Sequence, residues 1–440
     1  MRIGLVGFSW DGNFDREFAK RKLSEAREML GAHGEVVGPA EPICTAAEGR
    51  QAGRQLEVEG VDALILLQGT FCGAEPLPYI VERLHVPILL WALDEPMAGG
   101  RMRSNSLCGI NLMASVLKRL DRNYSYVYGD LSDAECRTEV ETFLKAAAAV
   151  RYLRTMRVGL AGSRAPGFFP LDVDEMALRH QVGPELVMID MMEIFFGAEP
   201  PAAEVEAVKA DFLQRVRNVA TVPPERLDRV ARTVAVLRGL FRKYELDALS
   251  VKCWPEFLNG YAAACSMISR LATDSLVAGC EGDVNGVVTS ALLQHLSGGE
   301  PTFLADLVQV DRAGDTGILW HCGVAPMEMA ADPGQIDFGL EFSGVGMNLE
   351  FALKPGRVTI ARLGTLNGRY RMLVMGGEAV ETPLLVRGTM AKIRFDVPGR
   401  QVLDTILLGG WEHHVTMVYG DYREALAQVA RQLGIELVQL

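Results

Sequence analysis

The chain opens with a short apolar segment that ends in glycine, and a closely similar segment recurs later. The two segments read Met1-Arg-Ile-Gly-Leu-Val-Gly7 and Met156-Arg-Val-Gly-Leu-Ala-Gly162. An aliphatic run that ends at a glycine is typical of the first strand of an α/β unit, where the chain enters a tight turn. We therefore predict two α/β units in tandem. Chance resemblance between two first strands is the alternative.

The residues after each start alternate between helical and strand-like patterns. A helical pattern at 15–30 precedes apolar runs at 35–37, 63–67 and 87–92, and the second copy offers weaker runs at 187–191 and 246–251. Such alternation predicts a parallel sheet covered by helices. Neither start has the Gly-x-Gly-x-x-Gly order that lets a backbone approach a pyrophosphate, which disfavours a nicotinamide or flavin enzyme.

After about residue 300 the pattern changes to short alternating runs separated by Pro-Gly, Asn-Gly and Gly-Gly turns. This pattern predicts an antiparallel sheet or small barrel. The predicted fold class is α/β, with two doubly wound parallel-sheet domains at residues 1–155 and 156–300. A β-rich, barrel-like antiparallel domain follows at residues 301–440.

Composition narrows the class of protein. With 440 residues, 49% of them hydrophobic and 23% charged, the chain resembles ordinary globular proteins of two or three domains. A net charge of −12 argues against a nucleic-acid partner. The apolar stretches are too short for a membrane span, and no signal peptide is evident. Eight scattered cysteines without a Cys-x-x-Cys pair favour a reducing, cytoplasmic setting and give no support to a zinc ribbon or a redox motif.

Carboxylates and imidazoles gather in four short segments of the last third of the chain. Three of the seven histidines lie there. Mixed carboxylate and imidazole sets suit a divalent cation that keeps open positions for a substrate. The segments are Cys-Glu-Gly-Asp at 280–283, Leu-Ala-Asp at 304–306, Trp-His-Cys at 320–322 and Glu-His-His at 412–414.

Two of these segments place carboxylates at strands. Glu281 follows a predicted strand at 276–278 and precedes a predicted helix from Val284, so it lies where open α/β sheets present residues to ligands. A surface position is its alternative, and Asp283 is more simply explained as the helix N-cap. Asp306 interrupts an apolar strand, which is costly unless the carboxylate is paired, coordinated or exposed to solvent.

The aromatic and imidazole candidates also have structural alternatives. His321 follows a predicted strand, where a histidine is often a hydrogen-bonded structural residue. The adjacent His413 and His414 would point to opposite sides of an extended chain, so at most one would enter a given site. Trp254 and Glu256 flank Pro255 after a predicted strand and could form part of a sugar-binding wall. A domain-interface tryptophan is the alternative.

The order of these segments resembles the L-fucose isomerase and L-arabinose isomerase family, including its short branch with members that act on sulfonated hexoses. The resemblance implies two α/β domains followed by a β-rich domain. It also implies an aldose–ketose isomerase that uses Mn²⁺, or another divalent cation such as Co²⁺ or Mg²⁺. Members assemble as homo-oligomers, trimers or hexamers, with sites near subunit contacts.

Carried onto this chain, the resemblance implies that Glu281 and Asp306 are metal ligands and the catalytic acid–base pair. It implies His414 as a third ligand with His413 as the alternative, and His321 as a further ligand of the arabinose isomerase kind. Substrate contacts are then expected from Trp254 and Glu256, together with His321 and His413. The predicted reaction passes through a cis-enediolate of an open-chain deoxy or sulfonated hexose or a pentose. A metal-dependent lyase or aldolase and a non-catalytic sugar-binding protein are the rival readings.

Overall fold

The computed structural model describes residues 1–440 except 11, 13, 96, 98, 258–263 and 340–346, and its chain divides into two compact units. Unit 1 comprises Met1–Arg151 and Glu424–Ile435, whereas unit 2 comprises Tyr152–Arg423 and Glu436–Leu440. The predicted boundary near residue 300 falls within unit 2. The division of that unit into two domains stays a prediction.

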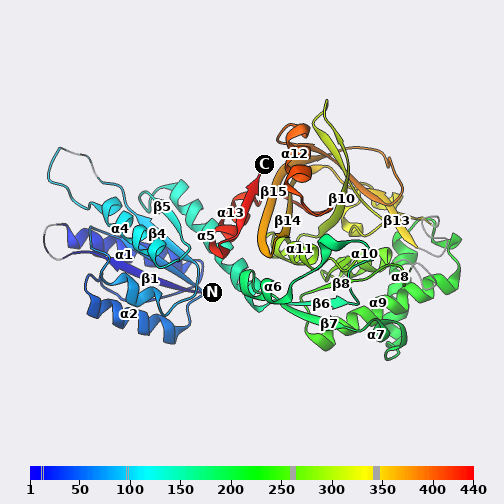
Figure 1. Ribbon diagram of the computed structural model, residues 1–440, viewed down its shortest axis with the longest axis horizontal. Helices are drawn as coiled ribbons and strands as arrows, with labels where there is room; N and C mark the ends of the chain where they lie inside the picture. The colour runs from blue at the N-terminus through cyan, green and yellow to red at the C-terminus, as the bar shows by residue number, and fades with distance from the viewer. Residues whose placement is uncertain (11, 13, 96, 98, 258–263, 340–346) are drawn as a thin grey trace. The chain divides into compact units, whose positions relative to one another are not determined.

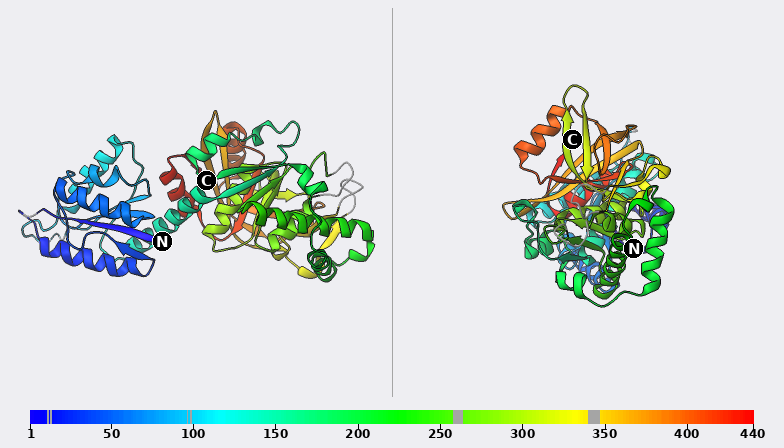
Figure 2. Two further views of the ribbon diagram at one scale, coloured as in Figure 1. Left: turned by 90° about the horizontal axis from the view of Figure 1, so that it is seen from below. Right: turned by 90° about the vertical axis from the view of Figure 1, so that its right-hand side faces the viewer.

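Unit 1 is a five-stranded parallel sheet with helices on both faces, in the order β2-β1-β3-β4-β5. Helices α1 and α5 pack apolar side chains on one face of the sheet, and α2, α3 and α4 do so on the other. Figure 1 and Figure 2 show the helices around this sheet. The strands are β1 (Arg2–Phe8), β2 (Glu35–Val37), β3 (Ala63–Gln68), β4 (Ile88–Ala92) and β5 (Ser125–Tyr128). The helices are α1 (Arg16–Gly31), α2 (Ala46–Glu59), α3 (Leu77–Val81), α4 (Ser106–Arg119), α5 (Ala134–Thr155) and the late α13 (Arg423–Leu433).

Unit 2 contains a second parallel sheet in the order β7-β6-β8-β9. The two recurring segments form β1 and β6. In the first sheet β1 lies between β2 and β3, and in the second sheet β6 lies between β7 and β8, so the two strands occupy equivalent positions. The strands are β6 (Arg157–Ala161), β7 (Glu185–Ile189), β8 (Ala248–Val251) and β9 (Val277–Cys280). The helices are α6 (Glu175–Gln181), α7 (Met191–Phe196), α8 (Ala202–Arg215), α9 (Pro224–Tyr244), α10 (Cys265–Thr273) and α11 (Val284–Leu296).

The strand predicted at 187–191 ends earlier than expected. Asp190 stops it, because its side chain accepts a hydrogen bond from the backbone N–H of Met192 and caps α7. The apolar residues that follow therefore belong to a short helix.

The last third of the chain forms a closed antiparallel barrel of six strands. The strands pair in the order β10-β11-β16-β15-β14-β17, and β17 returns to β10. They are β10 (Thr302–Asp311), β11 (Thr316–His321), β14 (Gly356–Leu366), β15 (Arg369–Val380), β16 (Thr389–Phe395) and β17 (His414–Tyr419). The sheet extends through β12 (Asp337–Gly339), β13 (Asn348–Ala352) and β18 (Glu436–Gln439), and α12 (Gly399–Gly409) precedes β17. The predicted fold class is confirmed.

Helix α11 connects the central sheet to the barrel (Figure 1). Every residue from 284 to 293 is buried, as expected for a helix that is apolar on all sides. The helix contacts β8 and β9 of the sheet and β10, β14 and β17 of the barrel. The turn between β9 and α11 is therefore held next to the barrel strands.

The β9–α11 turn has an unusual backbone. Glu281 and Gly282 both adopt left-handed conformations, with φ of +64° and +73°. Such a conformation is rare for a residue with a side chain and costs free energy, so the surrounding structure must hold Glu281 in place.

Among the helices of the described residues, none combines the length and apolar character of a membrane span.

Replacing Gly282 with alanine tests the packing of this turn. The added β-carbon would lie 2.4 Å from the carbonyl oxygen of Ser163. We expect the free energy of unfolding to fall by about 2–5 kcal/mol, the sum of backbone strain and steric clash. Urea denaturation followed by circular dichroism measures this. Gly298→Ala is the matched control, because Gly298 has φ of +75° and open space around it. Equal losses in the two variants would contradict the packing argument.

Candidate active site

Residues from three separate segments converge at the β9–α11 turn. Asp306 of β10 lies directly opposite His414 of β17, and cross-strand partners of this kind share one face of a sheet. The Nε2 atom of His414 lies 3.6 Å from Asp306 Oδ1 and 3.5 Å from Glu281 Oε2. The structure therefore brings together the three residues that the resemblance implies as ligands.

The buried ring of His414 presents an unprotonated nitrogen to these carboxylates. Its Nδ1 lies 2.9 Å from Asp283 Oδ2, and an ionised carboxylate fixes the proton on that nitrogen. Burial lowers the pKa of His414 and thus favours the neutral ring. Its Nε2 is buried and has no hydrogen-bond partner among the described residues. The unprotonated Nε2 of His414 thus faces two carboxylate oxygens and can donate a hydrogen bond to neither.

Asp283, at the N-terminus of α11, holds His414 in this orientation. Its side chain accepts a hydrogen bond from the Gly286 backbone N–H at 2.9 Å, which caps α11 as predicted. It also pairs with Arg362 of β14, at 2.5 Å and 3.1 Å, and both side chains are fully buried. Although burial favours the protonated acid, Arg362 and His414 hold the pKa of Asp283 well below its usual range.

Glu281 is charged for a similar reason. Burial alone would raise its pKa, but the hydrogen bond from His413 and the nearby rings of His414 and His321 outweigh burial and lower the pKa. His413 Nε2 lies 3.2 Å from Glu281 Oε2. Both carboxyl oxygens of an ionised Glu281 are acceptors, as cation binding requires.

His413 and His414 do not point to opposite sides of the chain. The expectation assumed an extended pair, but β17 begins only at His414, so His413 belongs to the preceding loop. The two ring centroids are 4.1 Å apart, and the ligand atoms of Asp306, His413 and His414 lie within 4.8 Å of one another. Both histidines therefore face the same cluster.

His321 also reaches the cluster, but its two ring nitrogens have other partners. Nε2 lies 3.0 Å from Cys280 Sγ, and Nδ1 accepts the backbone N–H of Cys322 at 2.8 Å. Burial lowers the pKa of His321, yet the Cys322 thiol and the nearby carboxylates outweigh burial and raise the pKa to about 9. The backbone hydrogen bond to Nδ1 fits only the neutral ring. The role of His321 as a ligand stays a prediction.

The predicted sugar-binding residues Trp254 and Glu256 contact different neighbours. Trp254 packs against Phe168 with ring centroids 5.4 Å apart, and Phe168 packs against His413 at 5.0 Å. Trp254 thus joins the site through Phe168. Glu256 instead pairs with Lys252 at 2.6 Å. A pocket of about 420 Å³ opens beside Asp306 and His413, with Trp411 among its apolar lining.

Sequence reasoning missed two residues of this site. Arg362 carried a usable signal, because a single arginine at a buried position of an alternating strand demands a buried partner. Phe168 carried none, because it lies in a loop and an isolated aromatic residue there has no periodic context.

Comparisons with known proteins agree with this geometry. Residues 11–154 match the N-terminal domain of the fucose/sulfoquinovose isomerases, and residues 321–440 match the C-terminal domain of L-fucose isomerase. The sulfoquinovose isomerase of Alkalicoccus urumqiensis is 29% identical over 434 residues, 97% of either chain. That of Priestia megaterium is 29% identical over 432 residues, 96% of either chain. The fold and the matches together define a sugar aldose–ketose isomerase.

The chain belongs to the L-fucose isomerase family, and it fits the branch that contains the sulfosugar isomerases. Among solved structures, a solute-binding protein of Agrobacterium vitis with bound D-fucose is 10% identical and covers 68% of this chain and 90% of its own. Its TM-score is 0.18, and a likeness so slight carries no argument.

Replacing Asp283 with asparagine tests the anchor. The variant keeps the shape of the side chain but removes the nearest carboxylate from the buried Arg362, which then has only Glu412 Oε2, 3.7 Å from its Nε. We therefore expect the free energy of unfolding to fall by about 3–5 kcal/mol at pH 7. A carboxylate with a lowered pKa stabilises the fold above its unfolded pKa and loses that contribution as pH falls. The difference between variant and wild type should therefore narrow from about pH 5 downward.

Chemical unfolding at several pH values measures this difference. Asp174→Asn is the control, because Asp174 caps α6 through the same type of contact, to the Ala177 N–H at 2.9 Å, but lies at the surface. Its change should stay within about 0.5 kcal/mol. A small, pH-independent change for Asp283→Asn would show that the ion pair contributes little.

Proposed function

We propose that this isomerase interconverts sulfoquinovose, the sugar in the names of its relatives, and the corresponding ketose. We propose further that a divalent cation held by Glu281, Asp306 and His414 is required. The observation that carries this proposal is the buried Nε2 of His414, an acceptor that faces two carboxylate oxygens and can donate a hydrogen bond to neither. A cation resolves this arrangement of acceptors, because it supplies the missing positive charge.

The chemical types of these side chains, and not only their positions, suit a divalent cation. Imidazole and carboxylate ligands suit Mn²⁺, and Co²⁺ or Mg²⁺ are alternatives. Asp283 holds the proton of His414 on Nδ1, which is the usual role of a carboxylate behind a metal-binding histidine. His413 and His321 are candidates for further ligands. A bound cation would act as a Lewis acid that stabilises negative charge on the sugar oxygens at C1 and C2.

Glu281 and Asp306 are then the acid–base pair. Isomerisation moves one proton between C1 and C2 and a second between their oxygens, so one group must accept a proton while another donates one. Glu281 is largely shielded from solvent, with 13% of its side chain exposed, and Asp306 is more open at 25%. Both lie near the same nitrogen of His414, at 3.5 Å and 3.6 Å, so both can reach one substrate bound there.

The residues around the cluster suit a hexose, which has polar hydroxyl groups and an apolar C–H face. Phe168, Trp254 and His413 form a continuous aromatic wall, on which the C–H face of a sugar can pack. The pocket beside Asp306 is of ordinary size for a small-molecule site. A trimer or hexamer with sites near subunit contacts stays a prediction from the family, and the exposed Leu407 and Leu408 of α12 support self-association.

Replacing each carboxylate separately tests the acid–base assignment. Glu281→Gln and Asp306→Asn keep the size of the side chain but remove its basicity, so kcat should fall by about 10²–10⁴-fold in each. Conversion of sulfoquinovose followed by nuclear magnetic resonance measures kcat. The controls are Glu245→Gln, at a left-handed residue like Glu281, and Asp311→Asn, on the same strand as Asp306. Near-normal turnover in both carboxylate variants would refute the assignment.

Metal removal and a substrate panel test the cation and the sugar. Protein stripped with a chelator should lose turnover and regain it with Mn²⁺, and sulfoquinovose should be converted faster than L-fucose or L-arabinose. Product mass separates an isomerase from a lyase, because isomerisation keeps all carbon atoms in one molecule. Full turnover without any cation would overturn the metal proposal, and preference for L-arabinose would overturn the proposed substrate.

A further inference from the structure

The cluster at the β9–α11 turn has a second side, which is lined by sulfur. Cys280 is the last residue of β9, and Cys253 lies two residues beyond the end of β8, which pairs with β9 in parallel. The carboxyl ends of two adjacent parallel strands meet at one edge of the sheet, so these cysteines are neighbours although they are far apart in sequence.

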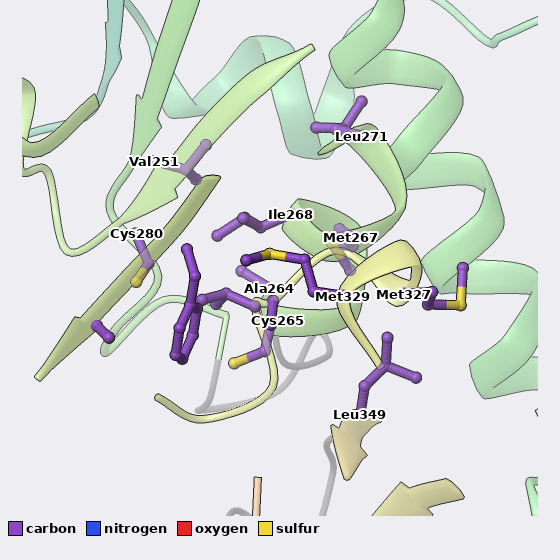
Figure 3. Close-up of a cluster of buried hydrophobic side chains, with 14 of the residues drawn as sticks. Val251, Ala264, Cys265, Met267, Ile268, Leu271, Cys280, Met327, Met329 and Leu349 are labelled. Atoms are coloured by element: carbon purple, nitrogen blue, oxygen red, sulfur yellow. The ribbon is translucent and has the colours of Figure 1, made fainter. Parts of the chain in front are cut away.

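Glu281 completes this group. The sulfur atoms of Cys253 and Cys280 and a carboxylate oxygen of Glu281 all lie within 4.8 Å of one another. Cys280 is only 1% exposed and Cys253 is partly buried, and neither forms a disulfide. Figure 3 shows Cys280 next to Val251 and Ile268, at the border of a large apolar cluster. The thiols therefore face the carboxylate from a dry, preformed wall.

We propose that Cys253, Cys280 and Glu281 form a second cation site, selective for thiophilic divalent ions such as Zn²⁺ and Cd²⁺, which competes with the catalytic cation for Glu281. Soft thiolate ligands favour Zn²⁺ and its heavier relatives, whereas Mn²⁺ and Mg²⁺ favour oxygen ligands. On binding, each thiol releases its proton to the buffer and a metal–sulfur bond forms, with no oxidant involved. Only the competition rests on the proposed function.

The shared carboxylate predicts how this isomerase responds to metal ions. Glu281 belongs both to the group with Cys253 and Cys280 and to a group with His321 and His414. Two cations bound on either side of this carboxylate repel each other, so occupancy of one position weakens binding at the other. A thiophilic ion would therefore draw Glu281 away from the imidazole side and inhibit the enzyme without entering the catalytic position.

Cadmium binding to the chelator-treated, full-length protein tests the sulfur site directly. Cd²⁺ bound to thiolates gives an ultraviolet charge-transfer band, and Mn²⁺ does not. We expect this band to develop with the first equivalent of Cd²⁺. Cys253→Ser should weaken that binding by at least about tenfold, the lower end of the effect of removing even an outer partner of a metal ligand.

Cys44→Ser is the matched control. Cys44 is also partly buried and also contacts a second thiol, that of Cys72, with 2.9 Å between the sulfur atoms. The charge-transfer band that develops with the first equivalent of Cd²⁺ should be unchanged in this variant. A band that is absent from wild type, unchanged in Cys253→Ser, or lost in Cys44→Ser overturns the sulfur site. Because Cys253 is only partly buried, its serine variant should fold, and circular dichroism checks this.

Competition experiments separate this inference from the proposed function. Saturating Mn²⁺ should raise the Cd²⁺ concentration needed for half-maximal band intensity, and Glu281→Gln should weaken the binding of both ions. If Mn²⁺ binds, as measured by its magnetic resonance signal, but leaves Cd²⁺ binding unchanged, then Glu281 is not shared. If Mn²⁺ does not bind while the cadmium band depends on Cys253, the sulfur site stands and the proposed metal requirement fails.

Discussion

The buried carboxylate of Asp283 is the interaction on which the site depends. It caps α11, neutralises the fully buried Arg362 of the barrel and fixes the tautomer of His414. Each of these partners comes from a different part of unit 2, so one side chain links the central sheet to the barrel. The ionised form is stable in this dry place because a full positive charge, a helix N-terminus and an N–H donor all act on it. Removing any one of them leaves the others buried with incomplete compensation.

Local patterns in the sequence predicted the parts of the site that depend on local structure. The strand at 276–278, the start of the helix at Val284 and the capping role of Asp283 all follow from periodicity and capping chemistry. The roles of Arg362 and Phe168 depend on contacts between distant segments. Closure of the barrel likewise depends on the pairing of β15 with β16, which alternation alone does not specify. The direction of His413 was missed because it requires the exact residue at which β17 begins, and strand ends are poorly defined by propensity.

The cysteines are a second case in which contacts between distant segments cannot be predicted from sequence spacing. Spacing in the sequence gave no metal motif, since a helix separates Cys253, which follows β8, from Cys280, which ends β9. Parallel pairing of β8 with β9 brings them to one edge of the sheet. Glu281 then stands between a sulfur side and an imidazole side, in a left-handed conformation that only a tightly packed turn can maintain. Glu281 therefore has both the strained backbone of the turn and the carboxylate that the two groups of ligands share.

The division of the chain into units has a consequence for its biosynthesis. Unit 1 begins at Met1 but also contains Glu424–Ile435, which are translated only after Tyr152–Arg423 of unit 2. Within it, the side chain of Gln432 bonds both the backbone of Ile88 and the hydroxyl of Ser125, at the ends of β4 and β5. Domains that are contiguous at the N-terminus can complete their folding while the ribosome is still working. Unit 1 cannot complete its packing until residues 152–423 of unit 2 have also been synthesised.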